Sequence, residues 1–251
     1  MITKRSAYIF FPALFTAGAF LAACSKQFSE PVYPVAALNV VNALPTSAPL
    51  ILVQGSISSV IGDFSNISAL SYGNTFVLTP MKGSEAFYAV QQNGDTASVS
   101  PQGGDFIFSG KLSFTAGNLY SLFITGADTA NPDYLFVQDI PLVHTDSTLG
   151  IRFVNLSTGS NAVNVDIQGQ PNGGVVSSLA YKSITAFQNF PATSSISSYM
   201  FEFRDAASGN LLASYTLGGV HTILFKNMTI ALIGQPAGGM VAQTCILENN
   251  F

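Results

Sequence analysis

The chain contains few residues whose types and spacing could support catalysis or metal binding. Its 251 residues include two histidines, His144 and His221, and two cysteines, Cys24 and Cys245. A zinc site needs three or four ligands, and no cluster of His and Cys occurs along the chain. We therefore predict no metal, and expect His144 to belong to a connection between domains and His221 to a turn.

Nucleophilic and acid–base chemistry also lack their usual patterns. The Gly-x-Ser-x-Gly turn that presents a nucleophilic serine is absent. The thirteen acids are scattered singly, by prediction in turns, so paired carboxylates for glycoside cleavage cannot be placed. Asp128 and Asp133 flank a loop without the alternating aspartates of a calcium loop, and we expect them to be solvated. No cofactor is predicted.

The N-terminus has the pattern of an export signal. A basic pair precedes an apolar run, Ala7 to Phe20, which ends in Leu21-Ala22-Ala23-Cys24. This order is typical of a secretory signal, and the run is short for a membrane-spanning helix. The last four residues resemble the bacterial lipobox, whose cysteine is lipidated after cleavage. We predict a signal peptide over 1–23 and a membrane partner reached through a lipid on Cys24.

Residues 24–36 contain two prolines among polar residues and are predicted to be a tether. Ser25 after the lipidated cysteine resembles the outer-membrane sorting signal of enteric lipoproteins. We therefore expect an outer-membrane lipoprotein, on either its periplasmic or its surface face. With Cys24 lipidated, Cys245 has no intramolecular disulfide partner and is predicted to be a small buried apolar residue.

Composition restricts the partners. Charged residues are 9% of the chain and the net charge is −4 with nine Lys and Arg, so no basic surface can collect phosphates and nucleic-acid binding is not expected. The chain has no Trp, the ring on which many sugar-binding modules stack their ligands. Six tyrosines could take that role: Tyr33, Tyr72, Tyr88, Tyr134, Tyr181 and Tyr199.

A duplicated segment organises the chain. Ala37 to Gly55 and Gly150 to Gly169 both contain an apolar strand ending in Val-Asn, a short turn and a second apolar run ending in Gln-Gly. Further matches follow in the same order: Leu70–Tyr72 with Leu179–Tyr181, Pro80 with Pro191, and Asn118–Ile124 with Asn227–Ile233. Such a repeat decides the architecture, and predicts two copies of one domain, over 37–143 and 150–251.

Each copy is predicted to be an antiparallel β-sandwich. Turn residues separate short apolar runs in the first copy, at Leu38–Ala43, Leu50–Gln54, Phe64–Ser71, Asn74–Thr79, Glu85–Gln91, Lys111–Thr115, Leu119–Thr125 and Tyr134–Asp139. In the second copy, apolar and polar residues alternate along Val163–Gln168, Phe201–Arg204 and Leu211–Leu217, as in sheets with one wet face. Seven or eight strands in roughly 100 residues are typical of immunoglobulin-like sandwiches. The connection Ile140–Leu149 is short and half apolar, so the two sandwiches are expected to touch.

The order of these motifs resembles the domain of unknown function 4397 family, in its tandem Bacteroidetes lipoprotein form. The Val-Asn strand, the Leu-x-Tyr turn, the strand-ending proline and the Phe-x-Phe of Phe201 to Phe203 carry the resemblance. The family implies two immunoglobulin-like β-sandwiches and no catalytic residues. The second copy departs from the family's Asn-Ala-Ser-Pro pattern, with Asn155-Leu156-Ser157-Thr158.

Three loop segments resemble the Asp-(Ser/Thr)-small acceptor of O-glycosylation in exported Bacteroidetes proteins. They place candidate acceptors at Thr96, Thr129 and Ser147. Taken together, the sequence favours a non-enzymatic lipoprotein of the cell envelope that acts in binding, adhesion or assembly, with an envelope protein or a glycan as its partner. A carbohydrate-binding accessory of an outer-membrane uptake system is the first alternative. A hydrolase whose Ser, His and Asp meet only in space is the second.

Overall fold

The computed structural model describes residues 34–45, 48–55, 69–91 and 106–250. The chain from Pro34 to Phe251 forms one compact unit. Its described part consists of strands and turns, with a single 3-10 helix, η3, at Val220–Thr222. None of the described helical segments is long and apolar enough to cross a bilayer.

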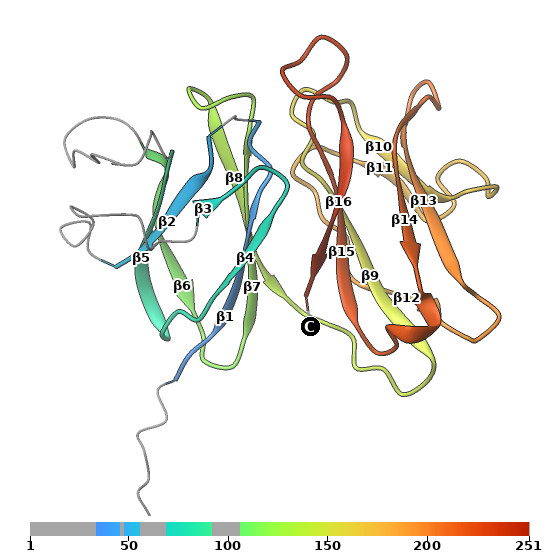
Figure 1. Ribbon diagram of the computed structural model, residues 1–251, viewed down its shortest axis with the longest axis horizontal. Coiled ribbons are helices and arrows are strands. Elements are labelled where there is room, and N and C mark those ends of the chain that lie inside the picture. Colours follow the sequence, from blue (N-terminus) through green and yellow to red (C-terminus); the bar gives the residue numbers. More distant parts are fainter. Residues whose placement is uncertain (1–33, 46–47, 56–68, 92–105, 251) are drawn as a thin grey trace, which may run out of the picture. The chain divides into compact units, whose positions relative to one another are not determined.

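The first half is a sandwich of two four-stranded sheets, of order β4-β1-β7-β8 and β3-β2-β5-β6 (Figure 1). The strands are β1 Ala37–Asn42, β2 Leu50–Gln54, β3 Ala69–Leu70, β4 Thr75–Leu78, β5 Gly83–Gln91, β6 Phe106–Phe114, β7 Leu119–Gly126 and β8 Pro132–Asp139. They confirm the predicted order of strands. The strand predicted at Lys111–Thr115 begins earlier, at Phe106, and part of the one predicted at Phe64–Ser71 lies outside the described residues.

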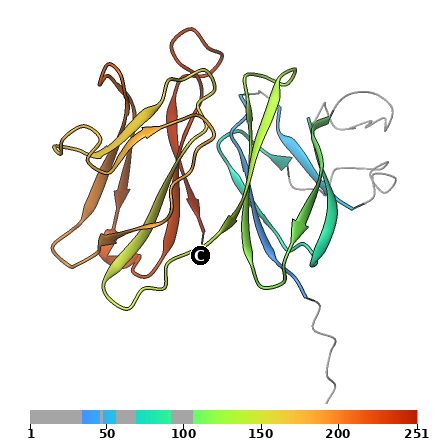
Figure 2. The ribbon, with the colours of Figure 1, turned by 180° about the vertical axis from the view of Figure 1, so that it is seen from behind.

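The second half repeats this plan, with sheets of order β12-β9-β15-β16 and β11-β10-β13-β14 (Figure 2). Its strands are β9 Thr148–Asn155, β10 Val163–Ile167, β11 Val176–Leu179, β12 Gln188–Pro191, β13 Ser198–Asp205, β14 Leu211–Gly218, β15 Asn227–Ile233 and β16 Thr244–Asn249. Every strand occupies the place of the strand eight positions earlier. The chain is therefore all-β, and the duplication read from the sequence is a duplication of whole immunoglobulin-like sandwiches.

Each sandwich contains one parallel pair among antiparallel ones. β1 pairs with β7, and β9 with β15, in parallel. The chain between the two parallel strands passes through strands of the opposite sheet before it returns. Parallel strands require a crossover connection of this kind. The sandwiches are otherwise antiparallel, as the sequence predicts, and the one parallel pair in each could not be read from the alternation.

The repeated Asn of the Val-Asn motif has the same structural role in both sandwiches. The Asn42 side chain donates from Nδ2 to the Leu70 carbonyl, at 2.9 Å, and accepts at Oδ1 from the Leu44 amide, at 3.1 Å. Asn155 is bonded in the same way to Leu179, at 3.2 Å, and Ser157, at 3.0 Å. Each buried amide thus joins the end of the first strand to the third strand.

The sheet register corrects one of the sequence matches by a residue. Asn42 lies opposite Ile124 and Asn155 opposite Leu232, so Ile124 corresponds to Leu232 and not to Ile233. Ile124 and Leu232 both belong to sandwich cores, whereas Ile233 belongs to a different cluster. A slip of one residue moves a strand's side chains to the other face of the sheet, and only the corrected match preserves their faces.

Alternating apolar residues fill each core. In the second sandwich, Val163 and Val165 of β10 point into the core on the same side as Phe201 and Phe203 of the neighbouring β13. All four are fully buried, as the alternation predicts. The exception is β14: Leu211 is 51% exposed, and its neighbour Leu212 packs against the core instead. A register shift between Phe203 and Arg204 is the cause, because a bulge changes which residue faces inward.

The two sandwiches contact each other through the outer faces of the sheets that contain β1 and β9. This inter-repeat cluster is buried and apolar, and consists of Val41, Ala43, Phe123, Val154, Leu156, Ala231 and Ile233. The Thr125 hydroxyl adds a hydrogen bond to the Leu156 carbonyl, at 3.0 Å. The contact expected from the short connection between the copies is confirmed.

Candidate functional site

His144 makes a relay that is not a catalytic triad. Its Nδ1 lies 2.8 Å from the Thr148 hydroxyl, which lies 2.8 Å from Asp146 Oδ1. The hydroxyl has a single proton to donate, so when it donates to Asp146 it accepts from His144. The other ring nitrogen, Nε2, is buried without a hydrogen-bond partner. A base of this kind needs an accessible Nε2 beside a nucleophile, and His144 has neither.

The remaining candidates from the sequence lie in η3, in the turn between β7 and β8 and at the start of β8. His221 is exposed in η3. Asp128 is engaged in its own turn, where Oδ1 accepts from the amides of Ala130 and Asn131, and the bonds to Asn131 are the main reason that its pKa is lowered. Asp133 pairs with Lys182 at 2.6 Å. Within the described segments no three His, Cys, Asp or Glu residues are grouped as metal ligands.

Cys245 and the tyrosines are mostly packing residues. Cys245 is a free thiol at the edge of the second core, where burial raises its pKa to about 12. Tyr72 packs against the inter-repeat cluster, Tyr88 against Phe106, and Tyr199 against the second core. Because these three rings come from separate elements and clusters, they do not together form the single aromatic face that would suit a sugar ring.

Two of the predicted modification sites can be placed. Thr129 lies half-buried in the turn between β7 and β8, and Ser147 is exposed just before β9. Cys24, Thr96 and Tyr33 lie outside the described residues, as do the predicted signal peptide and most of the tether.

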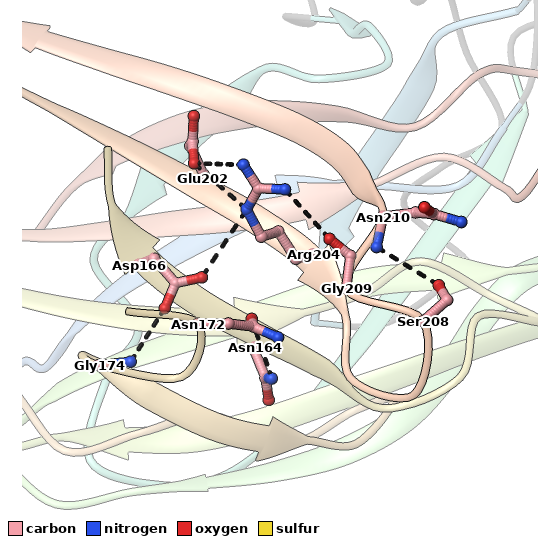
Figure 3. A network of polar contacts seen from close by, with 9 residues as sticks. All are labelled: Asn164, Asp166, Asn172, Gly174, Glu202, Arg204, Ser208, Gly209 and Asn210. Carbon is pink, nitrogen blue, oxygen red and sulfur yellow. Dashed lines mark hydrogen bonds and ion pairs between the residues drawn. The ribbon is translucent and has the colours of Figure 1, made fainter. Parts of the chain in front are cut away.

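A different group of residues forms a polar site on a strand face of the second sandwich. We call it the strand-face cluster: Asn164 and Asp166 on β10, with Glu202 and Arg204 on β13 (Figure 3). Asp166 lies opposite Glu202 in the register, and Asn164 opposite Arg204. The alternation that sends Val163, Val165, Phe201 and Phe203 into the core directs these four side chains to the outer face.

Arg204 is the centre of the cluster. Its Nη2 lies 2.7 Å from Glu202 Oε2, its Nη1 donates to the Gly209 carbonyl at 3.0 Å, and its Nε lies 4.0 Å from Asp166 Oδ2. A guanidinium has five N–H groups in a planar fork, so some remain for another acceptor. The Arg204 side chain is 30% exposed and that of Asp166 only 1%.

Asp166 and Asn164 hold the loop between β10 and β11 over the sheet. Asp166 Oδ1 accepts from the Gly174 amide at 2.9 Å, while Asn164 accepts from the Ser178 amide at 2.8 Å and donates to Asn172 at 3.1 Å. The second carboxylate oxygen of Asp166 is buried and has no hydrogen-bond partner. The outer face predicted to be wet is therefore largely covered here, because Asn164, Asp166 and Glu202 are all buried.

The hairpin after β13 completes the rim of the cluster. Asp205 accepts at Oδ2 from Asn161, at 2.9 Å, and at Oδ1 from the Ser208 amide, at 2.7 Å. These bonds, that to Asn161 first, lower the pKa of Asp205 to about 2. An ionised Asp205 fixes the turn that presents the Gly209 carbonyl to Arg204.

The first sandwich has apolar residues at the corresponding positions. The core residues Leu50 and Leu52 of β2 correspond to Val163 and Val165 of β10, so the outward residues between and beyond them are Ile51 and Val53. Opposite them on β5 lie Val90 and Tyr88. The same sandwich therefore forms without the strand-face cluster, and its polar groups are not a requirement of the fold.

The cluster offers hydrogen-bond donors and acceptors to a ligand. It consists of two carboxylates, one guanidinium and one amide held on two adjacent strands. The expectation that the acids lie singly in turns is wrong, because Asp139, Asp166, Glu202 and Glu248 lie in strands. A comparison of the two repeats position by position could have revealed the cluster, since charged residues replace apolar ones at its positions in only one copy.

Comparisons with known proteins identify no family. No protein-family model matches the chain, and no curated protein matches it. Among solved structures, the chain is similar to one described as alpha-glucan binding by a streptococcal virulence factor. The two chains are 11% identical in sequence, with a TM-score of 0.24, and the match covers 79% of this chain and 92% of that chain. A product complex of the multi-modular glycogen-degrading pneumococcal virulence factor SpuA is 10% identical with a TM-score of 0.23, over 79% of this chain and 20% of that chain.

Proposed function

We propose that this protein is a non-enzymatic lipoprotein of the outer membrane, anchored by a lipid on Cys24, whose tandem sandwich acts as a binding module. We further propose that it belongs to the domain of unknown function 4397 family, in its tandem lipoprotein form. The strand-face cluster of the second sandwich is the proposed binding site.

The observation that carries this proposal is the difference between the two repeats. Burying carboxylates and a guanidinium costs free energy unless they are paired and hydrogen-bonded. The first sandwich fills the equivalent face with apolar residues, at Ile51, Val53, Tyr88 and Val90, and so avoids that cost. The strand-face cluster costs free energy of folding and occurs in the second sandwich alone of the two. We therefore infer that it serves to bind a ligand.

A glycan is the ligand class that we favour over a protein. Sugar hydroxyls both donate and accept, and the cluster offers both functions, as guanidinium N–H groups on Arg204 and carboxylate oxygens on Glu202. These groups lie on neighbouring strands and are locked by pairing, so a ligand would bind them without ordering them first. The missing Trp and the scattered tyrosines make hydrogen bonding, and not ring stacking, the proposed basis of recognition.

The test is a glycan array together with a pull-down from a cell-envelope extract, both with the mature chain carrying Cys24→Ser. We expect a defined set of glycans to bind. If the pull-down captures a protein partner and no glycan binds, the proposal of carbohydrate binding is wrong. A role in assembly or adhesion would then take its place. Substrate turnover that is lost on changing a defined Ser, His or Asp would overturn the non-enzymatic proposal itself.

A further inference from the structure

A second polar network is buried where the two sandwiches meet, at the edge of the inter-repeat cluster. Arg152 on β9 makes an ion pair with Asp139 on β8, with 2.7 Å between Nη2 and Oδ1, and both side chains are almost fully buried. The same Nη2 donates to the Ser121 hydroxyl of β7 at 3.1 Å. Glu248 on β16 reaches Ser121 from the second sandwich, at 2.8 Å.

The hydroxyl of Ser121 has too few protons for its neighbours. It lies 2.7 Å from Asp139 Oδ2 and 2.8 Å from Glu248 Oε1. A hydroxyl carries one proton and can donate to only one of two carboxylates. The second carboxyl must therefore bring its own proton and donate it to Ser121. Asp139 has the direct ion pair with Arg152, so the proton belongs on Glu248.

The second oxygen of Glu248 leads to the same assignment. Oε2 is buried and has no hydrogen-bond partner. A charged carboxylate with one oxygen left bare in the interior is far more costly than a neutral carboxyl whose carbonyl oxygen is bare. Geometry and desolvation thus agree on a neutral Glu248.

Among the residues that the structure describes, Arg152 and Asp139 supply the charges that set this balance at Glu248. The other groups of the network are neutral: Asn39 of β1 donates to the Asn249 carbonyl, Thr229 of β15 accepts from Arg152 Nε, and Thr229 donates to Asn250. The ring of Phe187 covers the Arg152 guanidinium at 4.5 Å. Two acids thus share a single cation.

We infer that Glu248 keeps its proton in the folded protein, and that this proton couples the contact between the two sandwiches to pH. Burial is the main cause that raises the pKa of Glu248 from 4.5 to about 7, with the Asp139 charge adding to it and Arg152 and the hydrogen bonds opposing it. The inference goes beyond the proposed binding function and does not depend on it.

The direction of the pH effect follows from this raised pKa. The folded state binds one proton more than the unfolded state between the two pKa values. The stabilisation by Glu248 is therefore fully present below pH 4.5 and is lost as the pH rises to about 7. Within that window each pH unit raises this residue's contribution to the unfolding equilibrium constant about tenfold. Above it, the contribution stays constant.

Urea unfolding of the mature chain with Cys24→Ser, measured from pH 4.5 to pH 8, tests the inference against Glu248→Gln. The neutral amide can donate to Ser121 as the protonated acid does, so the variant should lose this part of the pH dependence. Glu85→Gln, in the first sandwich, should keep it. A Glu248→Gln variant whose unfolding constant changes with pH as steeply as that of the parent would overturn the inference.

A second measurement does not require the variant to fold well. Carbon-detected NMR of the carboxyl groups of the unsubstituted mature domain should show one buried glutamate titrating near 7, well above its usual 4.5. If every glutamate resonance titrates at or below 4.5, Glu248 is ionised in the folded protein and the proposed pH coupling does not exist.

Discussion

At the scale of single residues, the repeated Asn42 and Asn155 each satisfy two buried backbone groups. Replacing Asn155 by Ala leaves the Leu179 carbonyl and the Ser157 amide without these partners. Leaving buried polar groups unsatisfied costs about 1 to 3 kcal/mol each. We expect Asn155→Ala to lower the free energy of unfolding by at least that amount in urea titrations. An Asn155→Ala variant that unfolds with the same free energy as the parent would refute this role of the side chain.

Gly126 and Gly234 are a second matched pair of residues. Their φ values are 133° and 87°, and an added Cβ would come within 2.4 Å of the carbonyl oxygen of Asn131 or Ala242. Both left-handed strain and a backbone clash oppose any side chain there. We expect Gly234→Ala to destabilise the protein by more than about 1 kcal/mol. Gly218→Ala is the control, because nothing lies within 4 Å of its Cβ position.

At the scale of elements, most strands could be predicted because their two-residue period and their turns are local. Whether the outward-facing side chains are buried or exposed could not be predicted correctly from the sequence. Asn164, Asp166 and Glu202 look like solvated strand residues, yet all three are buried, and the loop folded back over β10 is bonded to Asn164 and Asp166. Strict alternation with Leu217 would put Leu211 on the inward face, because the sequence does not reveal the extra residue, Leu212, that shifts the register of β14. The pairing of Arg152 with Asp139 depends on contacts between the repeats, which a local pattern does not contain.

The loop between β10 and β11 provides the prediction at this scale. The Gly174 amide donates to Asp166, and the Ser178 amide to Asn164. Asp166→Ala removes the first of these anchors and leaves the Gly174 amide only its bond to the Pro171 carbonyl within the loop. The loop is then no longer tied to β10 through this amide, so the Gly174 amide should exchange its hydrogen with solvent faster. Native-state hydrogen exchange by NMR measures this. Asp166→Asn retains an acceptor oxygen and should leave protection largely intact. Unchanged exchange in the Ala variant would show that Asp166 does not hold the loop.

At the scale of the whole molecule, the inter-repeat cluster makes the two sandwiches one unit of stability. Phe123 is fully buried between them, and truncating a buried Phe costs about 3 to 5 kcal/mol. We expect a single unfolding transition for the mature chain, and a Phe123→Ala variant whose transition shifts as a whole. Two separate transitions in the parent protein, with only the first sandwich affected by Phe123→Ala, would contradict the fused arrangement.

The anchor is a property of the whole molecule too. If Cys24 carries the lipid, Cys24→Ser should move the protein from the membrane fraction to the soluble fraction and abolish incorporation of a labelled fatty acid. Cys245→Ser is the matched control, because that thiol lies within the second sandwich. Persistent membrane association of Cys24→Ser, with no lipid label in the parent protein, would require another mode of attachment.

The most direct test of the account is to measure ligand binding with the strand-face cluster changed. The mature chain, its Arg204→Ala variant and a Lys111→Ala control in the equivalent sheet of the first sandwich would be titrated with the glycans selected on the array. We expect Arg204→Ala to lose at least about tenfold in affinity, because a hydrogen bond to a charged group contributes about 1.5 to 3 kcal/mol, and Lys111→Ala to bind like the parent. Equal affinity of all three proteins would show that the cluster is not the binding site.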